Sequence, residues 1–157
     1  MFTTLKNLFS DMQGAAPGAE LFADDDVRLA EAALMFHVIS ADGEILPEER
    51  SKMLENLGRH YELSKAELSV IFEAAAKADH ESVDLYRFTA ILKKVMDRDQ
   101  RIAAIERLWE LVFADGKIHE FEDNVVWRIA QLLEVETVDR IAMKHRVRDR
   151  MDKGQGD

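Results

Sequence analysis

The chain has 157 residues, the length of one ordinary domain, and 47% of them are hydrophobic, which is enough for a single core. It contains no cysteine, which excludes disulfide bonds and thiolate metal sites and fits a reducing compartment. Its net charge of −10 argues against nucleic acid as the main partner, because nucleic-acid binding depends on Lys and Arg that neutralise phosphates.

The composition is typical of an all-α protein. Only 2 prolines and 7 glycines interrupt the chain, while residues that favour helices are abundant. No apolar run reaches the roughly 18 residues of a membrane span, and no signal peptide is recognisable, so we expect a cytosolic protein. We predict a compact bundle of seven to eight helices, with a helical domain at residues 21–151 and a disordered tail at residues 152–157.

Residues 1–20 are predicted to form a separate element, an amphipathic helix followed by the linker GAAPGAE. Large apolar side chains recur here at three- and four-residue spacings, on one side of a helix; they are Phe2, Leu5, Leu8, Phe9 and Met12. Membrane-surface helices are usually rich in Lys and Arg, whereas this one carries Lys6 alone. We therefore expect it to dock on the domain's own core, with a second subunit or a membrane surface as alternatives.

Within the domain, capping residues and apolar periodicity predict seven helices. They lie at about residues 28–41, 47–61, 65–78, 83–95, 98–114, 120–133 and 138–150. The first follows the acidic cap Asp24–Asp26 and is apolar on nearly all sides from residue 30 to residue 39, so we expect it at the centre. Ser64, Ser82 and Thr137 are the predicted caps of later helices.

A ten-residue stretch is duplicated. ADGEILPEER at residues 41–50 returns 73 positions later as ADGKIHEFED at residues 114–123. The same shift aligns apolar positions on both sides of the motif, so a helix-loop-helix unit at about residues 28–78 is repeated at about residues 101–151. Two such units most simply pack about a pseudo-twofold axis, with the two apolar incoming helices meeting in the centre.

Each copy contains Asp-Gly-x-Ile-x-x-x-Glu, with Asp42 and Glu49 in the first and Asp115 and Glu122 in the second. This is the spacing of the second half of an EF-hand calcium loop. In that loop the Gly allows a sharp turn and the Glu binds the ion with both carboxylate oxygens. The first half, which supplies further oxygens, is missing, so we expect no high-affinity EF-hand.

Two interpretations of the motif stay open. In one, the Gly ends a helix and the Glu caps the next, so the motif is purely structural. In the other, the two copies share a weak site for a divalent cation such as calcium, magnesium or zinc. Further carboxylates that could join such a site are Asp24, Asp25, Asp26, Glu44, Glu48, Glu120 and Asp123.

No catalytic motif is recognisable in the sequence, and we expect no enzyme activity. His119 and Glu120 begin like the zinc-protease motif H-E-x-x-H, but residue 123 is Asp in place of the second His. His37, on an apolar helix, is expected to be a hydrogen-bonded core residue. Trp109 and Trp127 also lie at apolar helical positions and are expected in the core.

Three stretches carry a resemblance to a known family: ISADGEILPEE, DLYRF and LWELVFADGKIHEFEDNVVWRIAQLL. They resemble the TerB-like family of bacterial tellurite-resistance and stress-associated proteins, in particular a proteobacterial branch. The resemblance implies an all-helical domain with a pseudo-symmetric duplication, in the cytoplasm or at the inner face of the membrane, whose acidic cluster binds metal. The implied positions are Asp42, Gly43 and Glu49 with Asp115, Gly116 and Glu122.

The leading functional hypothesis is a non-enzymatic module that senses or buffers a divalent cation and passes its state to a protein partner. The alternative is an interaction scaffold without a metal, which binds through its acidic body or its basic last helix. Peripheral membrane association is a further alternative, and the sequence leaves the oligomeric state open.

Overall fold

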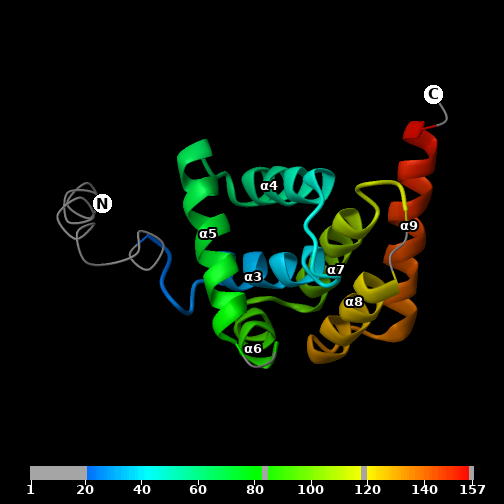
Figure 1. The fold of residues 1–157 in the computed structure, drawn as a ribbon. Helices are drawn as coiled ribbons and strands as arrows, with labels where there is room; N and C mark the ends of the chain where they lie inside the picture. Colours follow the sequence, from blue (N-terminus) through cyan, green and yellow to red (C-terminus); the bar gives the residue numbers. More distant parts are fainter. Residues whose placement is uncertain (1–20, 83–84, 118–119, 156–157) are drawn as a thin grey trace.

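The computed structural model describes residues 21–82, 85–117 and 120–155 (Figure 1). Within these ranges it contains seven helices and no strand, so the prediction of an all-α fold is confirmed. The helices are α3 (Val27–Ile39), α4 (Pro47–Tyr61), α5 (Lys65–Glu81), α6 (Tyr86–Val95), α7 (Arg98–Val112), α8 (Glu120–Leu132) and α9 (Thr137–Gln155). The N-terminal helix predicted within residues 1–20 lies outside the described residues.

Helix α3 lies at the centre of the bundle, as its apolar sequence predicted. It packs against α4, α5, α6, α7 and α8, and Figure 1 shows α4 on one side of it and α6 on the other. Nine of its 13 residues are buried, among them Ala30, Ala32 and Ala33. These small side chains let neighbouring helices approach closely, which is why one short helix can contact five others.

Helix α7 is the second central helix. It packs against α3, α4, α8 and α9, so the predicted contact between the two apolar incoming helices is confirmed. Trp109 is fully buried, and its indole Nε1 donates a hydrogen bond to the Arg140 carbonyl of α9 at 3.2 Å. Trp127 differs from expectation: its side chain is 44% exposed on α8, so its predicted place in the core is wrong.

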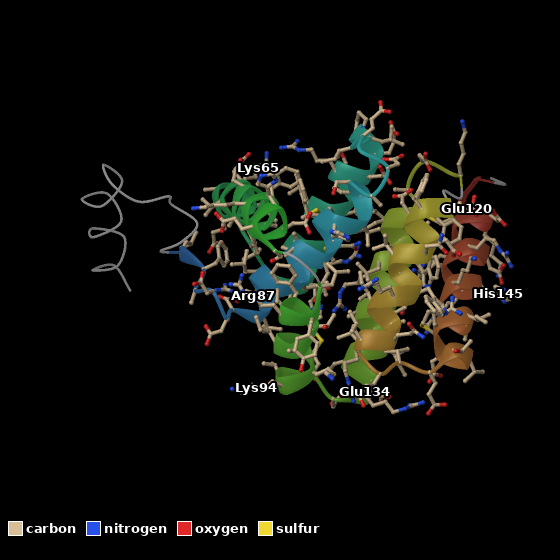
Figure 2. All side chains as sticks on the ribbon, turned by 60° about the horizontal axis from the view of Figure 1, so that its bottom comes forward. Lys65, Arg87, Lys94, Glu120, Glu134 and His145 are labelled. Carbon is tan, nitrogen blue, oxygen red and sulfur yellow. The ribbon has the colours of Figure 1, made fainter. Side chains whose placement is uncertain are left out.

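The buried side chains of both halves form one hydrophobic cluster. Leu34, Met35 and Ile39 of α3 contribute to it, as do Ile105 and Leu108 of α7. Many charged side chains lie at the periphery, and Figure 2 labels several of them: Lys65, Lys94, Glu120 and Glu134. Burial of each large apolar side chain contributes roughly 1.5–3 kcal/mol. The shared core is therefore the main contribution to the stability of the contact between the two halves.

A buried charged network joins α3, α4 and α7. Glu31 of α3 is 1% exposed and accepts hydrogen bonds from Arg107 at 2.6 and 3.0 Å and from the Tyr61 hydroxyl at 2.6 Å. Burial and the adjacent Glu31 carboxylate raise the pKa of Tyr61 well above its usual value. Burial alone would lower the pKa of the Arg107 guanidinium, but its bonds to Glu31 raise the pKa above its usual value, so the guanidinium stays charged inside the protein.

Local capping explains most helix starts. The Asp26 side chain accepts a hydrogen bond from the Arg28 amide at 2.9 Å and begins α3. Ser64 does the same for α5 through the Glu67 amide, at 3.2 Å, as predicted. Each cap satisfies a backbone N–H that has no partner inside the helix, which is typically worth about 1 kcal/mol.

Three helix boundaries differ from the prediction. Ser82 ends α5, where its amide donates to the Asp79 carbonyl at 3.2 Å, and it does not cap the next helix, which begins at Tyr86. Helix α9 begins at Thr137, so this residue lies in the first turn and is not the cap. The same helix continues to Gln155, past the predicted end near Arg150, so most of the predicted disordered tail is helical.

Candidate functional site

The two Asp-Gly turns have the same local geometry. In the first, the Ser40 amide donates to the Phe36 carbonyl at 3.0 Å and the Gly43 amide donates to the Ser40 carbonyl at 2.9 Å. In the second, residues 73 positions later make the same two bonds, Phe113 to Trp109 at 3.0 Å and Gly116 to Phe113 at 3.0 Å. The duplication in sequence is therefore matched by equal turns, whereas an overall pseudo-twofold axis stays a prediction.

Glycine is required in both turns by the backbone conformation. Gly43 has a φ of +86° and Gly116 a φ of +80°, a region that L-residues with a side chain enter only at a cost. A Cβ atom at Gly43 would meet nothing within 4 Å. Backbone conformation, and not lack of space, therefore selects glycine at this position.

The aspartate of each motif folds back on its own turn. Asp42 Oδ1 accepts a hydrogen bond from the Glu44 amide at 3.1 Å, and Asp115 Oδ1 accepts one from the Lys117 amide at 3.0 Å. Such bonds from a side chain to the backbone two residues further on are typical of Asp in turns. They orient both carboxylates beside the start of the following helix.

The glutamate of each motif is buried, although glutamate is rarely fully buried without a partner. Glu49 is 2% exposed and Glu122 is 1% exposed. Glu49 lies in the first turn of α4, where its Oε1 accepts a hydrogen bond from the Leu46 amide at 3.2 Å. Its other oxygen, Oε2, is also buried.

Glu122 brings the two copies of the motif together. Burial, the adjacent Glu49 side chain and the negative charges of Asp42 and Asp115 together raise the pKa of Glu122 to about 10. Two ionised carboxylates cannot donate a hydrogen bond to each other. A proton or a cation must therefore lie between Glu49 and Glu122 when these two side chains are in contact.

The four predicted site residues thus lie in one region, with the glutamates inside and Asp42 exposed at the surface. Carboxylate oxygens are the ligands that calcium and magnesium prefer, so the chemical type of these four side chains suits either ion. Among the described residues, however, no three Asp, Glu or His side chains are already arranged to hold a metal ion. A cation would therefore have to draw the aspartates inward.

Several of the further carboxylates that could join the site lie elsewhere or are engaged by other side chains. Asp26 caps α3 and pairs with Arg28 at 2.7 Å, at the end of the helix opposite to the turn. Asp24 lines a separate groove. Asp123 pairs with Lys144 of α9 at 2.9 Å. The sequence indicated the local density of acidic residues but could not show which of them are engaged by other helices.

Comparison with known proteins identifies the family. The model of the family described as tellurite resistance protein TerB matches residues 28–145, which is most of the chain. The protein therefore belongs to the TerB family, and it is an all-α module associated with tellurite resistance. TerB domains are generally non-enzymatic. No curated protein and no solved structure matches the chain.

The match covers both Asp-Gly turns and all four motif carboxylates, so the resemblance seen in the sequence is confirmed. Within the described residues, none of the helices is both long enough and apolar enough to span a membrane.

Proposed function

We propose that this TerB-family module binds a divalent cation between its two Asp-Gly turns, through Asp42, Glu49, Asp115 and Glu122. The observation that carries the proposal is the contact between two buried glutamates, one from each copy of the motif, beside two turns with the same hydrogen bonds. Two buried carboxylates in contact cost free energy unless a proton or a cation offsets their charge, and a divalent cation can do so for both.

Proton and cation compete for the same place in this proposal. The raised pKa of Glu122 means that a proton stays on the site near neutral pH when no metal is present. Metal ligands have to be deprotonated, so binding releases this proton, and affinity falls as the pH falls. Oxygen ligands favour calcium or magnesium over zinc, which prefers nitrogen and sulfur.

In the proposed function the ion ties the start of α4 to the start of α8. Glu49 would hold it from the first of these helices and Glu122 from the second, with the aspartates on the solvent side. Cation binding would thus stiffen the contact between the two halves, and an acidic, non-enzymatic surface would pass this state to a protein partner. The lack of cysteine agrees with a cytoplasmic location.

A second candidate function is an interaction scaffold without a metal. It is favoured by the capping bond from the Leu46 amide to Glu49 and by the turn bonds of Asp42 and Asp115, which already give each motif a structural role. On this alternative the buried glutamates share a proton permanently, and metal has no effect on stability.

Thermal unfolding of EDTA-treated protein, titrated with calcium, magnesium, manganese and zinc, separates the two functions. For a cation site we expect a saturable rise in melting temperature. The ion should increase the free energy of unfolding by about 2.7 kcal/mol at a concentration 100-fold above Kd. The rise should be lost in Glu49→Gln/Glu122→Gln and kept in the control Glu48→Gln/Glu120→Gln, in which both residues are exposed. An unchanged melting temperature with every ion would favour the scaffold.

A further inference from the structure

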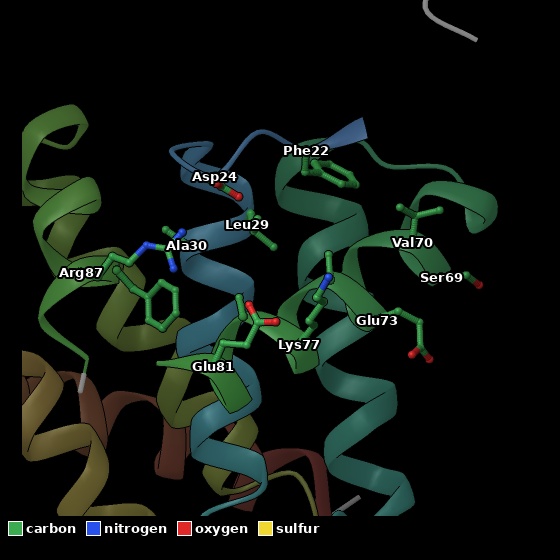
Figure 3. Close-up of a pocket in the computed structure, with 13 residues that line it drawn as sticks. Phe22, Asp24, Leu29, Ala30, Ser69, Val70, Glu73, Lys77, Glu81 and Arg87 are labelled. Carbon is green, nitrogen blue, oxygen red and sulfur yellow. The ribbon is translucent and has the colours of Figure 1, made fainter. Parts of the chain in front are cut away.

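A groove of about 520 Å³ lies on the side of the molecule away from the Asp-Gly turns, between the start of α3, the length of α5 and the start of α6 (Figure 3). Its floor is apolar and consists of buried side chains: Phe22, Leu29, Ala30 and Phe88. Its rim carries both charges, with Glu73, Lys77 and Glu81 along α5.

The wall of the groove is an apolar stripe of small side chains on α5. Val70, Ala74 and Ala78 follow each other at four-residue spacing and are half-buried, so their apolar surface remains partly accessible. A helix surface with small side chains allows a second helix to pack at close range. The stripe is therefore suited to a helix with an apolar face, more than to a charged ligand.

The sequence supplies such a helix at the right place. The described chain begins next to the groove, because Phe22 forms part of the floor. Twenty residues precede Leu21, and the spacing of their apolar residues from Phe2 to Met12 predicts a helix with one apolar side. This helix would be about 17 Å long, and the part of α5 from Ser69 to Glu81 that lines the groove is about 20 Å long.

The linker, residues 13–20, is long enough for the N-terminal segment to reach the groove. Residues 13–20 can span at most about 27 Å when extended, which is enough to place a helix that ends at Met12 along α5. Attachment to the same chain also gives the segment a high effective concentration at the groove. The single Lys6 in residues 1–13 makes a membrane surface a poorer partner for the same apolar face.

We propose that residues 2–12 form an amphipathic helix that docks in the α5 groove of its own chain. The apolar face with Leu5, Leu8 and Phe9 covers the stripe formed by Val70, Ala74 and Ala78, while the polar face with Asn7 is directed to solvent. The docked helix would lie beside the end of α3 that is remote from the acidic turns.

Disulfide trapping tests this arrangement directly, because the natural chain contains no cysteine. Single cysteines at Leu5, Leu8 or Asn7 are combined with single cysteines at Val70, Ala74 or Ala78 in the full chain, and oxidised product is followed on non-reducing gels. A disulfide needs Cα atoms within about 7 Å. We expect at least one of the Leu5 or Leu8 pairs to close within one chain, several-fold faster than every pair with Asn7 and independently of protein concentration.

Three results would overturn the proposal. Equal rates for Leu8→Cys and Asn7→Cys would show that no face of the segment is docked. Disulfides that form only between chains, and increase with protein concentration, would assign the groove to a second copy. No closure with any pair, combined with binding to phosphatidylserine vesicles that Leu8→Asp abolishes, would assign the apolar face to a membrane.

A stability measurement supports the trapping experiment without any cross-link. Leu8→Asp should lower the melting temperature of the full chain by about 3 °C or more and increase amide hydrogen exchange in α5, because it places a charge in the groove. Asn7→Asp, on the polar face, should leave both unchanged. Identical exchange in α5 for wild type and Leu8→Asp would contradict docking in cis.

Discussion

Glu49 and Glu122 are the residues on which the account of this TerB-family protein depends. Each occupies the third position of a helix, where a carboxylate normally caps the backbone and faces water. Here both are buried and in contact across the two halves. A stability contribution that depends on the charge state of two side chains should be visible as a dependence on pH.

For metal-free protein we predict that the free energy of unfolding decreases as the pH rises. The pKa of Glu122 is raised from 4.5 to about 10 in the folded state, so the folded state holds a proton that the unfolded state releases. This contribution is fully present below about pH 4.5 and is lost as the pH rises toward the folded pKa, by at most about 1.4 kcal/mol per pH unit.

Urea unfolding in EDTA at a series of pH values measures this slope. Glu122→Gln, which keeps the size of the side chain and cannot ionise, should flatten the slope between pH 5 and pH 9, whereas Glu120→Gln should not. The same slope in wild type and Glu122→Gln would show that another group titrates.

The Glu31–Arg107 pair is the second set of decisive residues. Replacing Arg107 with Met should reduce the free energy of unfolding by about 3–5 kcal/mol, because the buried Glu31 carboxylate would lose its charged partner. In contrast, Arg98→Ala at an exposed pair with Asp139 should cost less than about 1 kcal/mol. Urea unfolding checks both, and similar costs for the two variants would contradict the importance of burial.

At the scale of elements, the turns that end α3 and α7 depend on the left-handed conformation of their glycines. Gly43→Ala should destabilise the fold by roughly 1–2 kcal/mol, since the backbone cost is paid although there is space for the methyl group. Gly43→Asn should cost less, because Asn tolerates this conformation better. Chemical unfolding should show that wild type is the most stable of the three proteins, Gly43→Asn the next and Gly43→Ala the least. Equal stability of all three would mean that the turn can rearrange.

Helix positions were largely predictable from the sequence, because caps and apolar periodicity act locally. The ends of the helices were less predictable, because contacts with other helices extend a helix beyond its local signals. Asp79, in the last turns of α5, bonds to His37 of α3 at 2.7 Å, and α5 continues to Glu81 beyond the predicted end. Arg150 pairs with Glu106 of α7 at 3.0 Å, and α9 likewise continues past it.

Contacts between helices, which the sequence does not show, also explain why the prediction for Trp127 was wrong. Its spacing on α8 fits the apolar pattern of its neighbours, yet periodicity cannot tell which of two adjacent helix faces is covered by another helix. Phe121 and Trp127 of α8 are exposed, as are Val138 and Ile141 of α9. Trp109, in contrast, points from α7 toward α9 and is fully buried.

At the scale of the whole molecule, the sequence suggested that the four motif carboxylates share one site, but it did not show that the two glutamates are buried. The duplicated motif implied two equal turns, which the structure contains. That Glu49 and Glu122 would be buried and adjacent could not be read from a motif whose glutamate is usually a surface cap. The buried Glu31–Arg107–Tyr61 network was also missed, because its partners are 30 and 76 residues apart in sequence.

The measurement that tests the central proposal most directly is calcium titration of EDTA-treated protein by isothermal calorimetry, in two buffers with different enthalpies of ionisation. We predict saturable binding whose heat depends on the buffer, because Glu122 gives up its proton, and loss of that binding in Glu49→Gln/Glu122→Gln but not in Glu48→Gln/Glu120→Gln. Binding that the buried double variant retains, or no heat with millimolar calcium or magnesium, would contradict a cation site and leave the paired turns as structural caps.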